Sequence, residues 1–393
     1  MRIGSAHLGY CSNIHPGESW REVREQLALH IPVVRQRVAP GEAFGIGLRL
    51  SARAAQELAD PAALNELRAW LAAENAYVFT VNGFPHGSFH GSTVKSAVYE
   101  PDWRDPERLR YTLQLAELLA QLAPPDGRAS LSSVPLGYGA RLGEALPAMV
   151  EQLIACVAGL VALRGRSGIT VTLALEPEPD CVLQTLDEVL ALFSQHLHSD
   201  AAADRLAQLS GLTADAAHAA LREHLGLCLD ACHAAVEFED VAEALTRLQA
   251  AGIAIAKLQI SAGLRLPQAS AAARDWLARF DDPVYLHQVV ARAPDGALTR
   301  YPDLPQALAS PLCAQDEWRV HFHVPVFLEQ LGGCHSTQPL LSELLALQRE
   351  RPFTEHLEVE TYTWDVLPEP WRQGGVDEAI ARELVWVRAT LQA

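Results

Sequence analysis

The 393-residue chain lacks features that would place it in several common protein classes. No apolar run approaches the roughly 18 residues of a membrane span, and the opening segment, Met1-Arg-Ile-Gly-Ser-Ala-His7, has no apolar signal-peptide core. Lys and Arg number 31 against 48 Asp and Glu, and the formal charge of −17 argues against nucleic acid, because phosphate binding requires a clustered basic surface. We therefore expect a cytoplasmic protein with no nucleic-acid partner and no membrane insertion.

Cysteine pairs and nucleotide-binding motifs are also missing. The seven cysteines are odd in number and form no Cys-x-x-Cys pair, which argues against a disulfide framework or a zinc knuckle. Several lie in apolar segments and are expected to be buried free thiols. No G-x-G-x-x-G or G-x-x-x-x-G-K-[ST] motif follows any expected strand, so dinucleotide binding and a P-loop lose their main support.

Short apolar runs alternate with helical patterns along the whole chain, which is typical of α/β proteins with a parallel sheet. The expected core strands are 2–10, 44–50, 77–81, 129–134, 169–175, 225–229, 253–260 and 356–364. Helical patterns are expected after residue 20 and at 51–58, 62–74, 106–122, 144–163, 185–196, 236–251, 338–348 and 376–392, with an Ala-rich insertion at 200–223.

A closed (β/α)8 TIM barrel fits eight such units better than a doubly wound sheet, since barrels of about 250 residues can exceed roughly 400 with insertions. Regularity lapses at about 281–330, which we interpret as an insertion that forms a hairpin or extra cover over the barrel. The simplest organisation is one domain over residues 1–393.

The stretch Leu225-Gly-Leu-Cys-Leu-Asp-Ala-Cys-His233 carries the clearest chemical signal. A buried strand stops at a carboxylate, Asp230, and an imidazole follows at His233. Polar groups at a buried strand end are costly unless they are used, and strand ends of an α/β barrel are where metal and substrate sites gather. The alternative is structural: Asp230 caps the next helix and His233 packs in its first turn.

Polar residues end the neighbouring strands as well. Carboxylates, an amide and neutral imidazoles suit a hard or borderline divalent ion such as Mn²⁺, Zn²⁺, Co²⁺ or Mg²⁺. The candidate ligands are Glu176, Asp230, His233, Gln259, His323 and Glu360. The insertion also offers His287 and His321. A packed, hydrogen-bonded histidine is the alternative for either of His321 and His323, and His323 ranks above His321 because it lies closer to the strand end.

Other residues have competing explanations. Glu178 is ranked below Glu176, because it also suits a cap or a solvent-facing position. Of Glu358 and Glu360 we expect Glu360 to point inward and Glu358 outward. Lys257 is a possible proton carrier, although a lone lysine there is as often a salt-bridge partner.

Loops rich in histidine and aromatic residues follow the first and third strands. Residues expected to line a substrate pocket are His7, His15, Asn82, His86 and Trp364, with His90 as a further member. Trp20, Phe84, Tyr138 and Trp364 would supply apolar faces for a sugar ring or an aromatic metabolite.

Glu at strand five, Asp-x-x-His at strand six, a polar ligand at strand seven and Glu at strand eight resemble the xylose-isomerase-like TIM-barrel superfamily, which includes sugar isomerases and epimerases and endonuclease IV-type metal enzymes. Many epimerase relatives have histidine at the strand-seven position, where this chain offers Gln259; its amide oxygen, or His323, would take that place.

The chain also resembles the EboE family of metabolite-traffic proteins from ebo gene clusters. The phrases that carry this resemblance are Tyr10-Cys-Ser-Asn-Ile-His-Pro-Gly-Glu-Ser-Trp20, Tyr285-Leu-His-Gln288, Trp318-Arg-Val-His-Phe-His-Val-Pro325 and Glu358-Val-Glu-Thr-Tyr-Thr-Trp364. The resemblance implies a bacterial cytoplasmic protein that handles or exports a secondary-metabolite precursor, with other ebo-cluster proteins as possible partners.

The leading hypothesis is a metal-dependent isomerase or epimerase that acts on a small hydroxylated or carbonyl metabolite. The ion would polarise a carbonyl or enediolate oxygen, Glu176 or Glu360 would act as general base, and Lys257 would be a second proton carrier. The alternatives are a non-catalytic carrier that binds a precursor in the barrel mouth and a metal-dependent phosphoester hydrolase.

Overall fold

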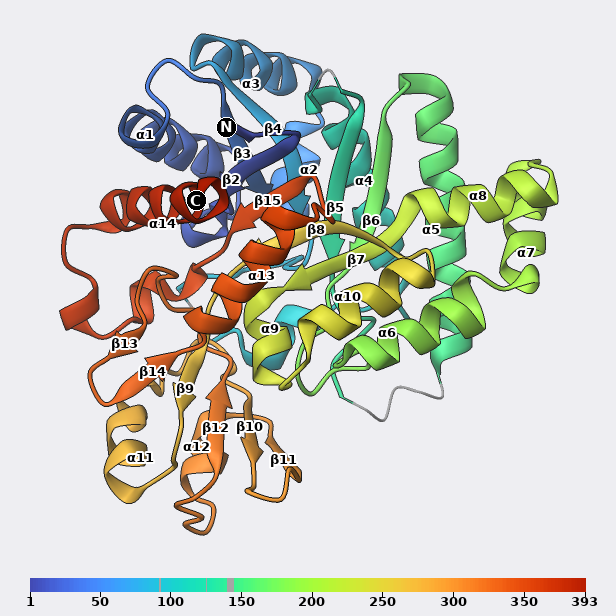
Figure 1. The fold of residues 1–393 in the computed structure, drawn as a ribbon. Coiled ribbons are helices and arrows are strands. Elements are labelled where there is room, and N and C mark those ends of the chain that lie inside the picture. Colours follow the sequence, from blue (N-terminus) through green and yellow to red (C-terminus); the bar gives the residue numbers. More distant parts are fainter. Residues whose placement is uncertain (92, 125, 140–144) are drawn as a thin grey trace.

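Eight parallel strands form one sheet in this computed structural model, which describes residues 1–91, 93–124, 126–139 and 145–393 (Figure 1). Around the sheet the strand order is β2, β15, β8, β7, β6, β5, β4, β3. Cys11, which follows β2, bridges in parallel to Gly47 of β3 and so closes the sheet into a barrel. A short β1 (Arg2–Ile3) pairs antiparallel with β2. The barrel strands are β2 (Ala6–Tyr10), β3 (Phe44–Arg49), β4 (Ala76–Asn82), β5 (Arg128–Ser133), β6 (Thr170–Leu175), β7 (Leu225–Asp230), β8 (Ala254–Ile260) and β15 (His356–Val359).

Helices connect the strands and cover the outside of the barrel (Figure 1). Their starts follow ordinary capping chemistry: Ser51 accepts a hydrogen bond from the Ala54 backbone at the start of α2, as its place in the sequence predicts. The helices are α1 (Trp20–Val38), α2 (Ala52–Leu58), α3 (Pro61–Ala73), α4 (Pro106–Leu122), α5 (Leu146–Ser167), α6 (Leu186–Leu192), α7 (Asp200–Ser210), α8 (Ala214–His224), α9 (Ala231–Val236), α10 (Val241–Ala250), α13 (Gln338–Glu350) and α14 (Val376–Gln392).

The (β/α)8 barrel predicted from the sequence is confirmed, with local corrections. The expected helix at 236–251 is α10, which starts later, at Val241, and a separate short helix, α9, precedes it and is capped by Asp230. The last strand ends at Val359, and residues 362–366 form a 3-10 helix. The helix expected before the fifth strand would start at Glu144, which lies outside the described residues; the described helix, α5, begins at Leu146.

By length and composition alone, α5 is long and apolar enough to cross a membrane. Core helices of soluble proteins meet the same two criteria. Here α5 packs against α4, α7, α8 and β6 in the outer layer of the barrel. Its buried residues include Met149, Leu153, Val157 and Leu160, which form one face of the helix. This packing is that of a helix in the wall of the barrel.

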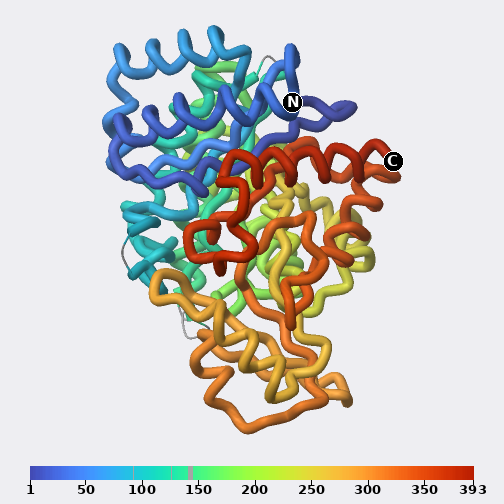
Figure 2. Tube along the Cα trace, turned by 90° about the vertical axis from the view of Figure 1, so that its left-hand side faces the viewer, coloured from blue at the N-terminus to red at the C-terminus, as the bar shows by residue number. Residues whose placement is uncertain are grey.

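The insertion is larger than the sequence predicts. It leaves the barrel after β8 and forms a six-stranded antiparallel sheet in the order β11-β10-β12-β9-β14-β13, so its strands span 264–336 and not only 281–330. Figure 2 shows it extending from one end of the barrel, well away from the two chain termini. Its elements are β9 (Leu264–Leu266), α11 (Ala271–Leu277), β10 (Val289–Arg292), β11 (Leu298–Tyr301), α12 (Leu304–Leu308), β12 (Glu317–Val320), β13 (Gln330–Leu331) and β14 (Cys334–Ser336).

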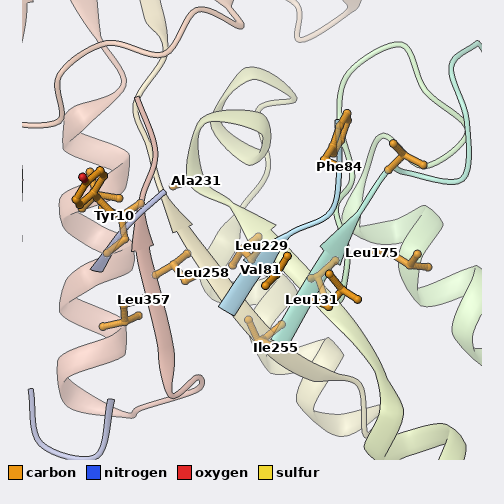
Figure 3. Packing of buried hydrophobic residues seen from close by; sticks show 14 of the residues in the cluster. Tyr10, Val81, Phe84, Leu131, Leu175, Leu229, Ala231, Ile255, Leu258 and Leu357 are labelled. Atoms are coloured by element: carbon orange, nitrogen blue, oxygen red, sulfur yellow. The ribbon is translucent and has the colours of Figure 1, made fainter. Parts of the chain in front are cut away.

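Apolar and polar residues alternate along the barrel strands, since neighbouring side chains of a strand point to opposite faces. Leu229, Leu258 and Leu357 belong to the main hydrophobic cluster, which Figure 3 shows from close by. Between them, Lys257 and Glu358 lie inside the barrel and form a buried ion pair with 2.6 Å between Nζ and Oε2.

The expectation that Glu358 faces outward is therefore wrong. Residues two apart on a strand share a face, so Glu358 and Glu360 both point inward. Gly47 makes room for this arrangement, because a Cβ at Gly47 would lie 1.5 Å from Oε1 of Glu358.

Candidate metal centre

Three carboxylates converge at the carboxyl ends of the barrel strands. Glu176 follows β6, Asp230 ends β7 and Glu360 follows β15, and all three side chains are buried. One oxygen from each lies within 4.8 Å of the other two. The barrel brings them together because the ends of its parallel strands meet around one mouth.

Asp230 has two separate roles, one for each carboxylate oxygen. Oδ1 accepts hydrogen bonds from the His233 backbone at 2.9 Å, which caps α9, and from the Ser261 hydroxyl at 2.7 Å. Oδ2 is buried and has no hydrogen-bond partner among the described residues. The capping explanation and the ligand explanation are therefore compatible, because each concerns a different oxygen.

Three buried imidazoles lie beside these acids. The insertion brings in two of them, because the segment after β12 runs between Gln288 and Ala262, with backbone bonds from His321 to Gln288 and from Val324 to Ala262. Nε2 of His323 lies 3.8 Å and Nε2 of His233 3.9 Å from Oδ2 of Asp230.

Each of these imidazoles donates its Nδ1–H to a protein oxygen. His233 donates to the Pro177 carbonyl at 2.9 Å, His321 to the Gln288 side-chain oxygen at 2.8 Å and His323 to the Glu360 carbonyl at 2.8 Å. Nε2 is then the nitrogen that carries the lone pair on every ring, and on His321 the Tyr362 hydroxyl lies 3.3 Å from it. Metal-binding histidines are commonly fixed in this way by an outer hydrogen bond.

Burial and mutual repulsion set the protonation of the acids. Burial, followed by the charges of Glu360 and Asp230, raises the pKa of Glu176 well above its ordinary value. Burial, followed by the charges of Asp230 and Glu358, raises the pKa of Glu360 in the same way. Burial would also raise the pKa of Asp230, but His233, His323 and the hydrogen bonds that its carboxylate accepts lower it, so Asp230 favours the anion. Glu176 and Glu360 are unfavourable as anions beside it unless a cation lies among the three acids.

Burial also lowers the pKa of His233, His321 and His323, which keeps the imidazoles neutral and able to bind a metal. Cys232 lies beside two of these rings. Burial, together with Asp230 and Glu178, raises the pKa of its thiol well above the ordinary value, so the sulfur remains protonated and is a poor ligand.

The donor set fits a divalent ion. Buried polar atoms without a hydrogen-bond partner, among the described residues, include Oε2 of Glu176, Oδ2 of Asp230 and Nε2 of His323. Unpaired buried polar atoms are costly, and these are oxygens and imidazole nitrogens that a hard or borderline ion accepts. Asp230 belongs both to the carboxylate group with Glu176 and Glu360 and to a group with His233 and His323.

Two asparagines hold the Glu360 carboxylate. The side-chain amides of Asn13 and Asn82 donate to Oε1 of Glu360 at 2.7 and 2.9 Å. Asn82 ends β4 and Asn13 lies just after β2, and these two strands flank β3 in the closed barrel, so two nearby strand ends fix one carboxylate. This geometry orients Glu360 toward the cavity that the two asparagines also line.

Glu178 lies two residues after Glu176 in the chain and is also part of the site. Its Oε1 accepts hydrogen bonds from the Tyr99 hydroxyl at 2.6 Å and from the Gln288 amide at 3.3 Å. Nδ1 of His321 is 3.2 Å away, and burial raises the pKa of Glu178. Glu178, His233 and His321 form a further group whose ligand atoms lie within 4.8 Å of one another.

A cavity of about 520 Å³, including its open mouth, lies above the carboxylates. Its lining residues combine the acidic end of the site with apolar and aromatic side chains: Asn13, Asn82, Phe84, Pro85, Phe89, Val94, Lys95, Val98, Tyr99, Glu176, Glu178, His233, Tyr285, Leu286, His321, Glu360 and Tyr362.

Of the residues expected to line a substrate pocket, Asn82 and Phe84 line this cavity, and the others lie apart from it. His7 is at the opposite end of the barrel, where it bonds to Asp126 and Tyr77. His15 stacks on His30 at the outer helices, with ring centroids 4.0 Å apart. His86 bonds to Glu107, and Trp364 is buried in the main core.

Two further polar residues of β8 face the inside of the barrel, and Gln259 is in register with Asp230 of β7. Lys257 is paired with Glu358; burial would lower its pKa, but the charges of Glu358 and neighbouring groups raise it, so the ammonium holds its proton. Gln259 shares the inner face of β8, and both polar atoms of its amide lack a partner among the described residues. His287 supports the site indirectly, because its Nδ1 donates to the His321 carbonyl at 3.0 Å.

Four further residues of the site are not among the candidates that the sequence predicts, namely Asn13, Tyr99, Gln288 and Tyr362. Asn13 and Gln288 lie within phrases that carry the EboE resemblance, as does Tyr362, so their presence in those phrases was the available signal. Tyr99 follows a loop without a distinctive motif, and nothing in its sequence surroundings indicates its contact with Glu178.

No protein-family model matches the chain, and no curated protein matches it. Among solved structures, the chain is similar to a xylose isomerase-like TIM-barrel protein from Mycobacterium smegmatis in complex with magnesium, with 13% identity, a TM-score of 0.52 and coverage of 99% of this chain and 98% of that chain. It is also similar to the IolI protein solved with a zinc atom (12% identity, TM-score 0.49, 98% and 97% covered) and to the probable 3-DHS dehydratase AsbF from Bacillus anthracis (13%, 0.45, 96% and 97%). The likeness to the first of these shows the fold, a xylose isomerase-like TIM barrel.

Proposed function

We propose that this protein is a divalent-metal-dependent enzyme that isomerises or epimerises a small hydroxylated or carbonyl metabolite. The observation that carries the proposal is the convergence of Glu176, Asp230 and Glu360 around buried oxygens that have no partner, beside the free Nε2 of His323. These four residues would hold the ion, and His323 would take the place expected for Gln259. When bound, the ion supplies Lewis-acid polarisation of a substrate oxygen.

The residues of the chain supply the proton transfer. Glu360 is held by two amide donors and faces the cavity, so it is placed to remove a proton from a carbon next to a carbonyl group. Glu176 lines the same cavity and would transfer the proton at the second reacting carbon atom of the substrate. Lys257 is less suited to this task, because its ammonium lies below the carboxylates and is neutralised by Glu358.

Solvent deuterium exchange tests the proposal. Purified protein loaded with Mn²⁺, Zn²⁺, Co²⁺ or Mg²⁺ would be incubated in D₂O with a panel of aldoses, ketoses and hydroxy ketones, and deuterium at carbon would be followed by NMR. Wild type is expected to introduce deuterium into at least one compound, and Glu360→Gln is expected to abolish this while His218→Ala, on α8, leaves it unchanged. A loaded wild-type protein that exchanges no compound would contradict the proposal.

A carrier that binds a precursor without converting it is the second candidate. The apolar walls of the cavity favour it, because retention without chemistry needs only complementary contact. It also agrees with the EboE resemblance, from which we propose that the protein acts in the cytoplasm on a secondary-metabolite precursor alongside other ebo-cluster proteins. Ligand binding without deuterium exchange would select this candidate.

A further inference from the structure

The upper walls of the cavity are built from a small aromatic cluster that is separate from the barrel core. Phe89, Tyr285 and Tyr362 come from the loop after β4, the insertion and the turn after β15. Their ring centroids are 5.0 to 5.3 Å apart in all three pairs. Val94 joins the cluster, and Phe84 and Tyr99, 5.6 Å apart, form a further aromatic surface of the cavity.

Lys95 is the one lysine or arginine among the described residues that line the cavity, and its charge is already used. Its ammonium lies 2.7 Å from Oδ2 of Asp303 and donates to the carbonyls of Tyr285, at 2.7 Å, and Asp282, at 3.2 Å. Three acceptors use the three protons of a lysine ammonium. No cation of these lining residues is therefore free to bind a phosphate or carboxylate of a substrate.

Three acids line the cavity, Glu176, Glu178 and Glu360, and two of them, Glu176 and Glu360, form one group with Asp230. An anionic group at the aromatic walls would gain nothing from them and would find no free lysine or arginine among the described lining residues. A neutral ring would replace water on the aromatic faces and gain apolar burial and stacking.

We infer that the substrate pairs an uncharged, ring-bearing apolar body with one oxygen-rich end, such as an α-hydroxy ketone, and carries no phosphate. This inference rests on the proposed function for the oxygen-rich end, which would meet the ion and Glu360. The aromatic walls and the neutralised Lys95 carry the rest of it. The substrate class is therefore an aromatic or alicyclic hydroxy ketone, and not a sugar phosphate.

Three probes that share the α-hydroxy ketone group test the inference: 2-hydroxyacetophenone, dihydroxyacetone and dihydroxyacetone phosphate. Their affinities for the full-length, metal-loaded protein would be measured by isothermal titration calorimetry, with bound metal determined separately. The phenyl compound is expected to bind about tenfold or more tighter than dihydroxyacetone, because a buried ring adds apolar contact. The phosphate is expected to add no affinity.

A variant with a new cation provides the matched comparison. Leu286 is half-buried in the cavity wall, and Leu286→Arg would place a free guanidinium there, whereas Leu286→Met conserves the apolar wall. Leu286→Arg is expected to gain affinity for dihydroxyacetone phosphate by about tenfold or more, as a charge-assisted contact provides. Leu286→Met is expected to behave as wild type.

The outcomes separate this inference from the proposed function. Tighter binding of the phosphate than of the phenyl compound by wild type, or no binding of the phenyl compound at its solubility limit, overturns the inference whatever the metal content. If a protein that holds no metal still binds the phenyl compound more tightly than dihydroxyacetone, the inference of an apolar substrate body is supported. The proposed metal-dependent function is then contradicted.

Discussion

The Nε2 atoms of His233 and His321 lie 3.1 Å apart, and both rings give their Nδ1–H to other protein oxygens. Gln288 fixes the second of these assignments, because its amide nitrogen faces the Tyr99 hydroxyl, Glu178 and the Pro179 carbonyl, which leaves its oxygen for His321. Two lone pairs therefore face each other in a buried place. The Tyr362 hydroxyl, 3.3 Å from Nε2 of His321, can donate to one of them, and a metal ion between the two nitrogens would use both.

The first prediction concerns these tautomers. In metal-free protein, His233, His321 and His323 are expected to be neutral Nδ1–H tautomers, because each Nδ1 faces an oxygen that can only accept. Long-range ¹H–¹⁵N NMR of labelled protein distinguishes the two neutral tautomers, and His→Gln variants assign the signals. An Nε2–H pattern for two or more of the three rings would contradict the assignment.

The second prediction concerns the ion pair inside the barrel. Lys257→Met is expected to reduce the free energy of unfolding by about 3–5 kcal/mol, because it leaves Glu358 as an uncompensated buried charge. The double variant Lys257→Met/Glu358→Gln is expected to recover much of this loss. Urea denaturation measures both, and equal destabilisation of the single and double variants would show that the pair does not act as a unit.

Glu383 provides the third prediction. It is buried on α14 and accepts hydrogen bonds from the Thr361 hydroxyl at 2.6 Å and the Val326 backbone at 3.1 Å. Burial raises its pKa from 4.5 to about 7. Between pH 4.5 and about pH 7 the folded state thus keeps a proton that the unfolded state has released. The free energy of unfolding therefore falls as the pH rises through this window.

The matched variant is Glu383→Gln, whose amide oxygen can accept the same bonds. Its stability relative to wild type is expected to increase by roughly 3 kcal/mol between pH 4 and pH 8, the free energy that corresponds to such a pKa change. Denaturant unfolding of both proteins across this range gives the difference, in which the other titrating groups cancel. A constant difference would show that Glu383 titrates normally.

The fourth prediction concerns the amide donors to Glu360. Asn82→Leu removes one donor to its Oε1, and the deuterium exchange proposed above is expected to slow about tenfold or more, since a hydrogen bond to a charged group contributes roughly 1.5–3 kcal/mol. Asn65→Ala, on the exposed face of α3, is the control and is expected to exchange as wild type. Bound metal is expected to remain, because Asn82 is not a ligand, so loss of metal in Asn82→Leu would contradict this role.

The sequence predicted the barrel and the carboxylates because both depend on local order. Buried strands have recognisable apolar runs, and a residue at a strand end is placed at the barrel mouth by topology alone, as for Glu176, Asp230 and Glu360. The alternation of side chains along a strand also places Glu358 inside the barrel, because it lies two residues before Glu360. The error lay in treating residues two apart as facing opposite ways.

The insertion and the pocket walls could not be derived in this way. His323 and His321 reach the site only through antiparallel pairing of β12 with β9 and β10, which sequence spacing does not specify. His7, at the amino-terminal end of β2, and His15, beside His30, looked like pocket residues because a histidine-rich loop gives no direction for its side chains. Tertiary contacts decide such positions.

Elemental analysis of purified protein tests the central claim, the metal centre, most directly. Wild type and the control His218→Ala are expected to hold about one Mn, Zn, Co or Mg ion per chain after loading and dialysis, or more if the imidazole group binds a second. Asp230→Ala and His323→Ala are expected to lose most of it. A wild-type protein that holds no metal after reloading, or an Asp230→Ala variant that retains as much as wild type, would contradict the account.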